Sequence, residues 1–138
     1  MAYVSWLICC GEFNIKEDNL CDAKNMVVEI RTTQLPAMVR IPLDIAALFR
    51  TDDPGAEAPL DIRVAVLGAD NSLSPSEATW RIRFDDMQVL WGARIDQLYI
   101  PCSGFTSLII QGMEEGEWRQ KGAYTFMAIA ENEEEAEA

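Results

Sequence analysis

The sequence predicts an all-β domain, and more closely an antiparallel β-sandwich of about seven to nine strands in an Ig-like, Greek-key or jelly-roll-like arrangement. Leu60–Val66 and Trp80–Asp85 alternate apolar and polar residues without a break, which places successive side chains on opposite faces of a strand. A stretch rich in Asp, Asn and Ser separates the two segments and predicts that they are adjacent antiparallel strands of a half-exposed sheet. Gly, Pro and Asp interrupt the rest of the chain at short intervals, and the sequence shows no βαβ unit and no internal repeat.

In the N-terminal part, Tyr3–Cys10 predicts a first strand that is apolar enough to be buried on both faces. Glu12–Asp22 is polar and rich in Asn and Asp, which favour turns, so a hairpin or short loop is expected there rather than a helix. Met26–Thr32 is β-branched and alternating and predicts a second strand. Leu35-Pro36 then ends the ladder, because proline has no N–H group to donate.

Met38–Phe49 allows two interpretations. Alternation over Val39–Ile45 favours an edge or bulged strand that tolerates Pro42, and this is the interpretation we prefer. Alternatively, Leu43–Arg50 makes two helical turns after Pro42, since proline suits the first position of a helix. Thr51–Pro59 is rich in Asp, Pro and Gly and predicts a surface loop.

The C-terminal half is expected to complete the sandwich with short strands. These strands are Leu60–Leu67, Thr79–Phe84, Gln97–Ile100, Thr106–Gln111 and a closing strand within Trp118–Ala130. Met87–Arg94 is expected to be a connection, and Gly112–Gly116 a turn. Residues 1–130 are therefore predicted to form one sandwich domain, and residues 131–138, with five glutamates and no large apolar residue, a disordered acidic tail.

Composition limits the partners and the compartment. The chain has 138 residues, with 23 acidic and 11 basic side chains and a net charge of −12. Such a charge repels phosphates and anionic lipids, so we expect neither direct nucleic-acid binding nor a membrane partner. Apolar runs are too short to span a bilayer and no signal-peptide pattern is present, so the expected location is the cytoplasm. There, Cys9, Cys10, Cys21 and Cys102 are expected to be free thiols.

Residues that carry chemistry are scarce. The sequence contains no histidine, which removes the usual general base and the usual metal ligand and excludes hydrolases built on a histidine triad. The cysteines lack the paired spacing of structural zinc sites, and the carboxylate pairs Asp52-Asp53, Asp85-Asp86 and Glu114-Glu115 lack the spacing of an EF-hand. We therefore expect no catalytic residues, no metal and no cofactor, and a protein that is not an enzyme.

Five residues are candidates for an interface. Arg63, Arg81 and Arg83 occupy the polar positions of two neighbouring strands and form either cross-strand pairs with acids such as Asp61 and Asp85 or a basic patch that docks an acidic partner. Of the four tryptophans, Trp6 and Trp80 lie in the apolar register of strands and are expected in the core. The other two candidates are Trp91 and Trp118, which lie outside that register; a core position stays open for both.

Four segments carry a resemblance to a known family. They are Leu7–Glu12 at the end of the first strand, Leu35-Pro36-Ala37, Gly68–Ser72 and Gly122–Phe126. In their order along the chain they resemble a family of small, uncharacterised bacterial β-sandwich proteins that is known only as a domain of unknown function. The family's small-residue–Asp ending of the first strand is Cys-Cys-Gly-Glu here. The resemblance implies a β-sandwich and assigns no catalytic residue.

The expected function is that of a non-enzymatic, cytosolic interaction module of bacterial or phage origin. It would bind a partner protein, or a second copy of itself as a homo-oligomer, by strand addition or by face packing. Two alternatives remain open. One is an acidic inhibitor that mimics nucleic acid and occupies the basic cleft of a DNA- or RNA-binding protein, and the other is a small-ligand or carbohydrate-binding module that uses Trp91 and Trp118.

Overall fold

The computed structural model describes residues 2–16 and 20–131, and within this part of the chain every regular element is a β-strand. The strands are β1 (Tyr3–Ile15), β2 (Cys21–Met26), β3 (Glu29–Thr32), β4 (Ala37–Val39), β5 (Leu43–Arg50), β6 (Leu60–Leu67), β7 (Leu73–Ile82), β8 (Gln88–Ile95), β9 (Leu98–Ile100), β10 (Gly104–Glu114) and β11 (Glu117–Ala130). The all-β prediction is confirmed, but the described residues form eleven strands, so the expected seven to nine was too low.

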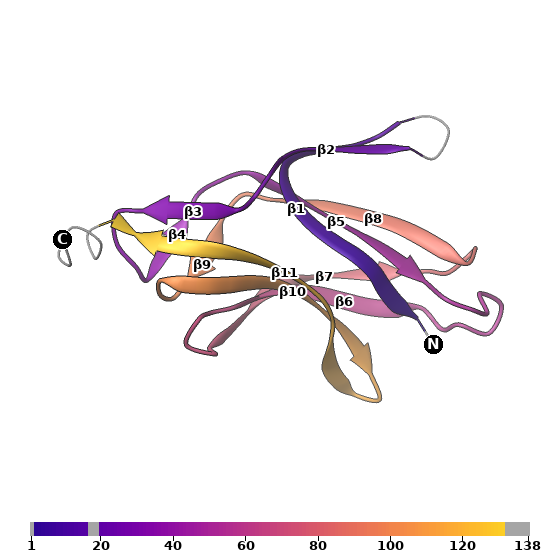
Figure 1. Cartoon of the computed structure of the whole chain (residues 1–138). Helices are drawn as coiled ribbons and strands as arrows, with labels where there is room; N and C mark the ends of the chain where they lie inside the picture. Colours follow the sequence, from indigo (N-terminus) through magenta and orange to yellow (C-terminus); the bar gives the residue numbers. More distant parts are fainter. Residues whose placement is uncertain (1, 17–19, 132–138) are drawn as a thin grey trace.

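The strands are arranged in three sheets (Figure 1). The first sheet has the order β2-β1-β5-β8, the second has the order β3-β11-β10-β6-β7, and β4 and β9 form a small third sheet. Neighbouring strands are antiparallel except β3, which runs parallel to β11. The predicted antiparallel pairing of Leu60–Leu67 with the strand that follows it is confirmed as β6 and β7.

Two corrections account for much of the higher strand number. The segment Met26–Thr32, expected as one strand, is divided between two sheets, because β2 ends at Met26 and β3 begins at Glu29. In the crossing, the Val27 N–H donates to Cys9 O of the first sheet, while Val28 O accepts from the Met127 N–H of the second, both at 3.0 Å. In addition, Met87–Arg94, expected as a connection, forms the edge strand β8.

The ambiguous segment Met38–Phe49 is extended. It contains the end of β4 and most of β5, with Pro42 immediately before β5, so the strand interpretation is confirmed for Leu43–Phe49 and the helical alternative is wrong. The expected edge position is wrong, because β5 lies between β1 and β8 and residues 40–42 separate it from β4. Pro42 lies where no ladder hydrogen bond is needed from its nitrogen. The expected disordered tail falls almost entirely outside the described residues, since only Glu131 of that segment is described.

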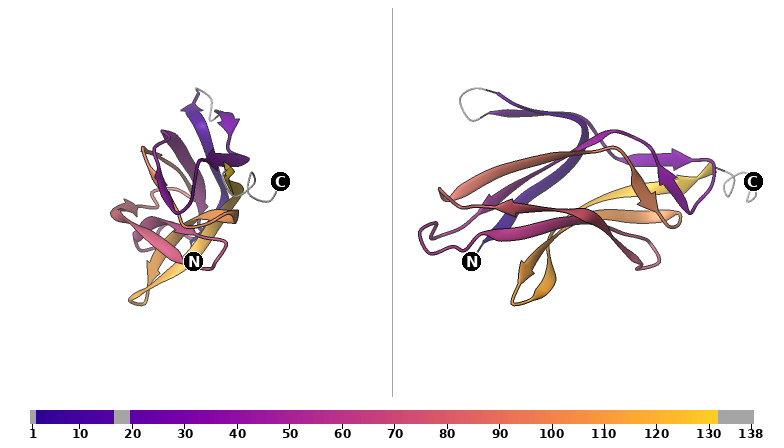
Figure 2. Two further views of the ribbon diagram at one scale, coloured as in Figure 1. Left: turned by 90° about the vertical axis from the view of Figure 1, so that its left-hand side faces the viewer. Right: turned by 180° about the vertical axis from the view of Figure 1, so that it is seen from behind.

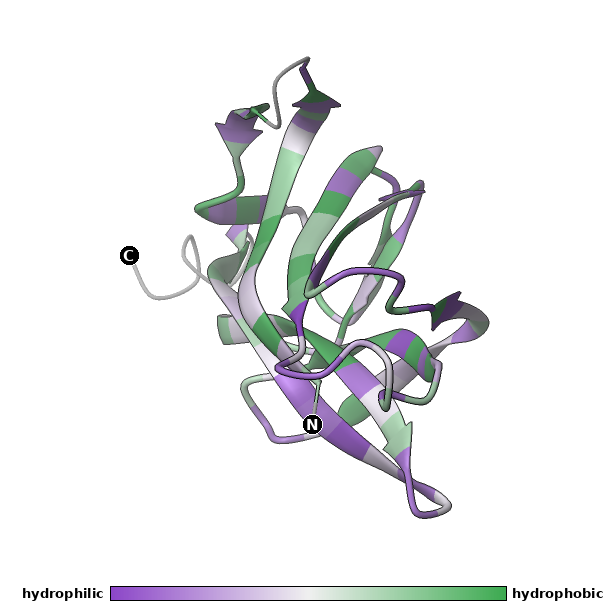
Figure 3. Ribbon diagram, turned by 90° about the vertical axis from the view of Figure 1, so that its right-hand side faces the viewer, coloured by the Kyte–Doolittle hydropathy of each residue, from purple (hydrophilic) through white to green (hydrophobic). Residues whose placement is uncertain are grey.

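Both large sheets contribute to one hydrophobic cluster. From the first sheet it receives Leu7, Cys9, Ile45, Ala47 and Phe49, and from the second Ile62, Val64, Leu108, Ile110, Phe126 and Ala128. These residues occupy every second position of their strands, and the positions between them include both half-exposed side chains such as Asp44 and Arg63 and buried ones such as Ile109. The most hydrophilic colours lie toward the turns (Figure 3). Burial of this alternating apolar set is the main favourable contribution to folding.

Two hairpins project from the sheets, β1–β2 on one side and β10–β11 on the other (Figure 2). β1 pairs with β5 only as far as Cys10, and its end from Glu12 to Ile15 pairs with β2 alone. This distal part bends back, because the rings of Phe13 and Trp6 lie 6.4 Å apart although seven positions separate them in the sequence. We call the part of this hairpin beyond Gly11 the arm.

Candidate functional site

The first feature that can bind a partner is the free edge of β8. β8 is the last strand of the first sheet and makes eight consecutive pairs with β5 without a register shift. It contains no proline, so its outer side presents backbone N–H and C=O groups that no described strand pairs. A long, regular edge of this kind is a template for an additional strand.

β7, one of the two edge strands of the second sheet, is different. β7 contains Pro75, and its pairing with β6 is irregular between Arg63 and Ala65. Proline and bulges are the devices by which proteins prevent pairing at an edge. Of β7 and β8, only β8 therefore has an edge that neither a proline nor a register shift interrupts.

A groove lies between β7 on one side and the end of β8 with β9 on the other. Its volume is about 790 Å³. The floor includes buried Val64, Val66 and Leu98 together with half-buried Trp80 and Ile95. On the rim, Met38 and Tyr99 lie directly opposite each other in the β4–β9 pair and are 50% and 39% exposed. We call this hollow the edge groove.

The charge of the edge groove has one sign. Glu77 and Asp96 line it and are exposed, and no Lys or Arg is among its described lining residues. An apolar floor with two carboxylates at the rim favours an apolar ligand that also carries positive charge.

The positions of the tryptophans follow the prediction in part. Trp91 faces inward from β8, with its ring 5.3 Å from Trp80 and 6.4 Å from Phe49, so this interface candidate packs against the core. Trp80 also packs against the core and lines the edge groove. Trp6, expected in the core, is instead half-buried outside the hydrophobic cluster and contacts Phe13. Its register places it opposite Leu48, on the outer face of the first sheet, because a bulge between Val4 and Trp6 changes the alternation.

On the outer face of the second sheet, Arg63 and Trp118 come together. The Arg63 guanidinium carbon lies 4.5 Å from the centre of the Trp118 ring, and its Nε–H donates to Gln111 Oε1 at 2.7 Å. Gln111 is only 7% exposed, which is unusual for a glutamine and holds its amide in place. The sequence analysis did not find Gln111, and the only signal was a polar residue at the end of an apolar strand.

The other two arginines do not extend this contact into a stripe. Arg81 lies directly opposite Asp61, and its Nε–H donates to an Asp61 carboxylate oxygen at 2.8 Å, as the cross-strand interpretation predicts. The hydrogen bond lowers the pKa of Asp61 and raises that of Arg81. Arg83 follows the end of β7 and is exposed, and among the described residues no ion pair with the expected Asp85 is found.

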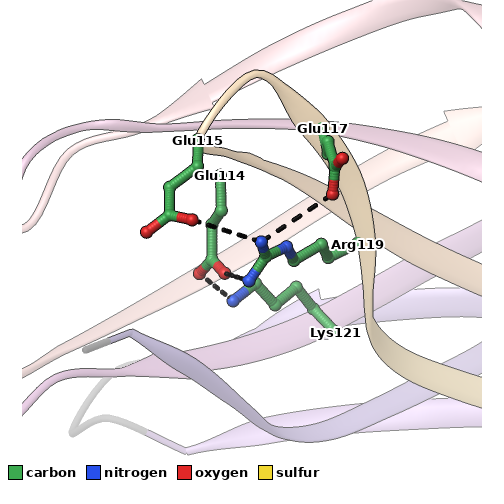
Figure 4. A network of polar contacts seen from close by, with 5 residues as sticks. All are labelled: Glu114, Glu115, Glu117, Arg119 and Lys121. Atoms are coloured by element: carbon green, nitrogen blue, oxygen red, sulfur yellow. Dashed lines mark hydrogen bonds and ion pairs between the residues drawn. The ribbon is translucent and has the colours of Figure 1, made fainter.

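A further charged cluster lies at the tip of the β10–β11 hairpin (Figure 4). Lys121 pairs with Glu114, and both side chains are largely buried at 10% and 19% exposure. Arg119 approaches Glu115 to 3.4 Å and both Glu114 and Glu117 to 3.8 Å. Because carboxylates surround both cations, this tip offers no free positive charge to an acidic partner.

Cysteine and carboxylate chemistry is limited in the described part of the chain. All four cysteines are free, with Cys9 and Cys10 buried, Cys21 exposed and Cys102 half-buried. Burial, with Cys10 and Asp44 nearby, raises the pKa of Cys9 to about 12, and burial also raises the pKa of Cys10. Both thiols are protonated at neutral pH and are therefore poor nucleophiles.

Within residues 2–16 and 20–131, no three side chains of the His, Cys, Asp and Glu types gather as metal ligands would. The same residues include no helix with the length and hydropathy to cross a membrane.

Comparison with known proteins gives one distant likeness to report. No protein-family model matches the chain, and no curated protein matches it. Among solved structures, the chain is similar to the PmoD soluble domain of a Methylocystis species, with 12% identity, a TM-score of 0.38, and coverage of 94% of this chain and 98% of that chain.

Proposed function

We propose that the protein is a non-enzymatic, cytosolic interaction module that binds an extended segment of a partner protein along the free edge of β8. The observation that carries the proposal is the regular, unblocked edge of β8 beside an apolar groove of about 790 Å³. A segment that adds to β8 gains main-chain hydrogen bonds, and its alternate side chains reach the side of the sheet on which Trp91 and Ile95 lie.

The chemistry of the bound segment follows from the charges. Glu77 and Asp96 at the edge groove and a net charge of −12 favour a segment with alternating apolar residues and at least one Lys or Arg. Two copies of this chain repel each other through the same charge, so a different protein is the preferred partner, and the expected homo-oligomer is the competing outcome of the test.

The edge groove lies between strands of the two large sheets, so its position depends on how these sheets pack. We propose that they form the expected sandwich, because residues of both sheets belong to one hydrophobic cluster and because Trp80 of the second sheet contacts Trp91 of the first. In that arrangement the inner faces interdigitate and the outer strands β7 and β8 border the same side.

Binding is tested with peptides of about ten residues, displayed at random, selected on the immobilised protein and then measured by tryptophan fluorescence. We expect selected peptides to alternate apolar residues and to contain Lys or Arg. Glu77→Lys combined with Asp96→Lys should weaken binding about fivefold or more at low salt. The matched control, Asp52→Lys combined with Asp85→Lys, changes the net charge equally on exposed residues elsewhere and should leave binding unchanged.

Three outcomes contradict the proposal. The first is selection of peptides with no alternation or no positive charge, and the second is equal weakening by the two charge-reversal pairs. The third is a native mass showing that the protein is a stable dimer whose β8 edge is already occupied.

The volume of the edge groove also favours a second candidate function. Small-ligand sites commonly have volumes of about 300–1,000 Å³, which includes this groove. A carbohydrate surface made from Trp91 and Trp118 is not favoured, because Trp91 packs inward on the core whereas Trp118 lies against Arg63. Screening small apolar amines by the same fluorescence assay separates a small ligand from a peptide.

A further inference from the structure

Among the three arginines of the expected basic patch, Arg63, Arg81 and Arg83, only Arg63 has its orientation fixed by groups other than a carboxylate. Gln111 accepts from its Nε–H at 2.7 Å, and the Trp118 ring lies under its guanidinium at 4.5 Å. Gln111 itself is buried at 7% exposure, so its amide cannot move freely with the surface. The structure therefore holds the arginine fork in place before any ligand arrives.

The remaining donors of Arg63 are available. Neither Nη group has a hydrogen-bond partner in the described residues, and Arg63 is half-exposed. The neighbouring Arg81, in contrast, is occupied by Asp61. On a protein with a net charge of −12, one oriented and unpaired guanidinium is a distinct local feature.

A hollow of about 330 Å³ lies on the same part of the second sheet, and it is lined by neighbours of Arg63 rather than by Arg63 itself. Its lining includes Thr79, which is directly opposite Arg63 in the β6–β7 pair, and Trp118, on which Arg63 stacks. Met113, Trp80, Asp61 and Arg81 complete the lining. The exposed Thr79 side chain supplies a hydroxyl donor next to the arginine, and Trp118 and Met113 supply apolar contact.

We propose that Arg63, supported by Gln111 and Trp118, is a binding site for a single carboxylate of a partner polypeptide, either an Asp or Glu side chain or a C-terminus. The N–H groups of a guanidinium fork donate two parallel hydrogen bonds to the oxygens of one carboxylate. A carboxylate is favoured over a phosphate because one free cation matches one negative charge. This site lies on the outer face of the second sheet and does not depend on strand addition at β8.

The site is tested by NMR titration of the Trp118 indole N–H and the Arg63 Nε–H. The probes are N-acetylglycine as a carboxylate, N-acetylglycinamide as its neutral counterpart, N-acetylaspartic acid α-amide as the side-chain form, and inorganic phosphate. We expect saturable shifts with the two carboxylates, none with the amide, and weaker binding of phosphate. Which of the two carboxylates binds more tightly identifies the source.

Three variants separate an oriented fork from simple charge. Arg63→Gln should abolish the shift of Trp118, and Arg63→Lys, which keeps the charge, should weaken binding about tenfold because it loses the fork. Gln111→Met should weaken binding severalfold while Arg63 stays charged. Arg83→Gln removes an exposed positive charge elsewhere and should leave binding unchanged.

Several results overturn the proposal. They are an absence of saturable shifts in the wild type, equal binding by Arg63→Lys and the wild type, equal loss in Arg83→Gln, and tighter binding of phosphate than of carboxylate. The Glu77→Lys and Asp96→Lys pair should leave this titration unchanged, so failure here and failure at the edge groove are distinguishable.

Discussion

Asp44 connects the arm to the first sheet, and replacing it should release the arm. Asp44 Oδ2 accepts a hydrogen bond from the Phe13 N–H at 2.8 Å, and its other oxygen accepts from Arg94 Nη1 at 3.1 Å. The carboxylate is 18% exposed, whereas the Arg94 side chain is 53% exposed. These two bonds come from different directions, one from the arm and one from β8, so the carboxylate bridges the arm to the edge strand.

The two contacts differ in strength. A hydrogen bond to a charged and largely buried group contributes about 1.5–3 kcal/mol, whereas an exposed ion pair contributes about 0–1 kcal/mol. Asp44→Ala should therefore lower the free energy of unfolding by about 2–3 kcal/mol, mostly through the lost bond to Phe13. Asp44→Asn keeps an oxygen acceptor and should have about half of that effect, and Arg94→Met should lower it by about 0.5 kcal/mol or less.

Denaturant unfolding followed by tryptophan fluorescence measures the free energies, and hydrogen exchange at the Phe13 amide measures opening of the arm. In Asp44→Ala this amide should lose most of its protection, while the Ile62 amide in β6 should change only by the global loss of stability. Asp44→Asn should also lower the pKa of Cys10, since the Asp44 charge is among the causes that raise it. Unchanged protection of Phe13, or equal costs for Asp44→Ala and Arg94→Met, would falsify the assignment of Asp44 as the connection.

Three further predictions concern local features. Arg81→Gln should reduce the free energy of unfolding at neutral pH. Because the folded-state pKa of Asp61 lies below its ordinary 3.8, this difference from wild type should disappear as pH falls through the lowered pKa. Unfolding curves at a series of pH values will measure it. Gly104→Ala should destabilise the protein by about 1–3 kcal/mol in thermal or denaturant unfolding, because φ is +123° and the new Cβ would lie 2.7 Å from the Ala69 Cβ. Gly116→Ala is the control: φ there is +80° but no atom lies within 4 Å of the new Cβ, so it should cost only about 1 kcal/mol. Iodoacetamide should label exposed Cys21 first and the two buried vicinal thiols of β1 only after unfolding, and rapid labelling of those thiols in the native protein would contradict their burial and raised pKa values.

Local pattern was sufficient for parts of the second sheet. Leu60–Val66 and Trp80–Ile82 carry the period-two pattern, and the structure pairs them with Asp61 opposite Arg81, a contact that the sequence predicted. The stretch before Trp80 was expected to separate the two strands, but β7 already begins at Leu73. The preference for a strand over a helix within Met38–Phe49 was also correct for its second part, which forms β5 directly after Pro42. In these segments the alternation and the burial of one face point to the same conformation, so no distant contact had to decide between alternatives.

Other features depended on contacts that a local pattern does not contain. Val27 and Val28 read as the middle of one strand, yet their hydrogen bonds go to different sheets. Trp6 is moved away from the core by a bulge. Gln111 is buried on the outer face, where it accepts a hydrogen bond from Arg63 of β6, which also stacks on Trp118 of β11. The sheet that each valine joins, the face on which Trp6 lies and the burial of Gln111 all depend on contacts with residues that are distant in the sequence.

The sequence alone determined that this chain is all-β, strongly acidic and free of histidine, because residue type and period-two alternation are local properties. Only the tertiary structure decided which strand edge stays open, where the edge groove lies, and which arginine keeps free donors. Those properties belong to pairs of segments that are distant in the chain, and the free energy that selects between pairings comes from packing the whole core at once.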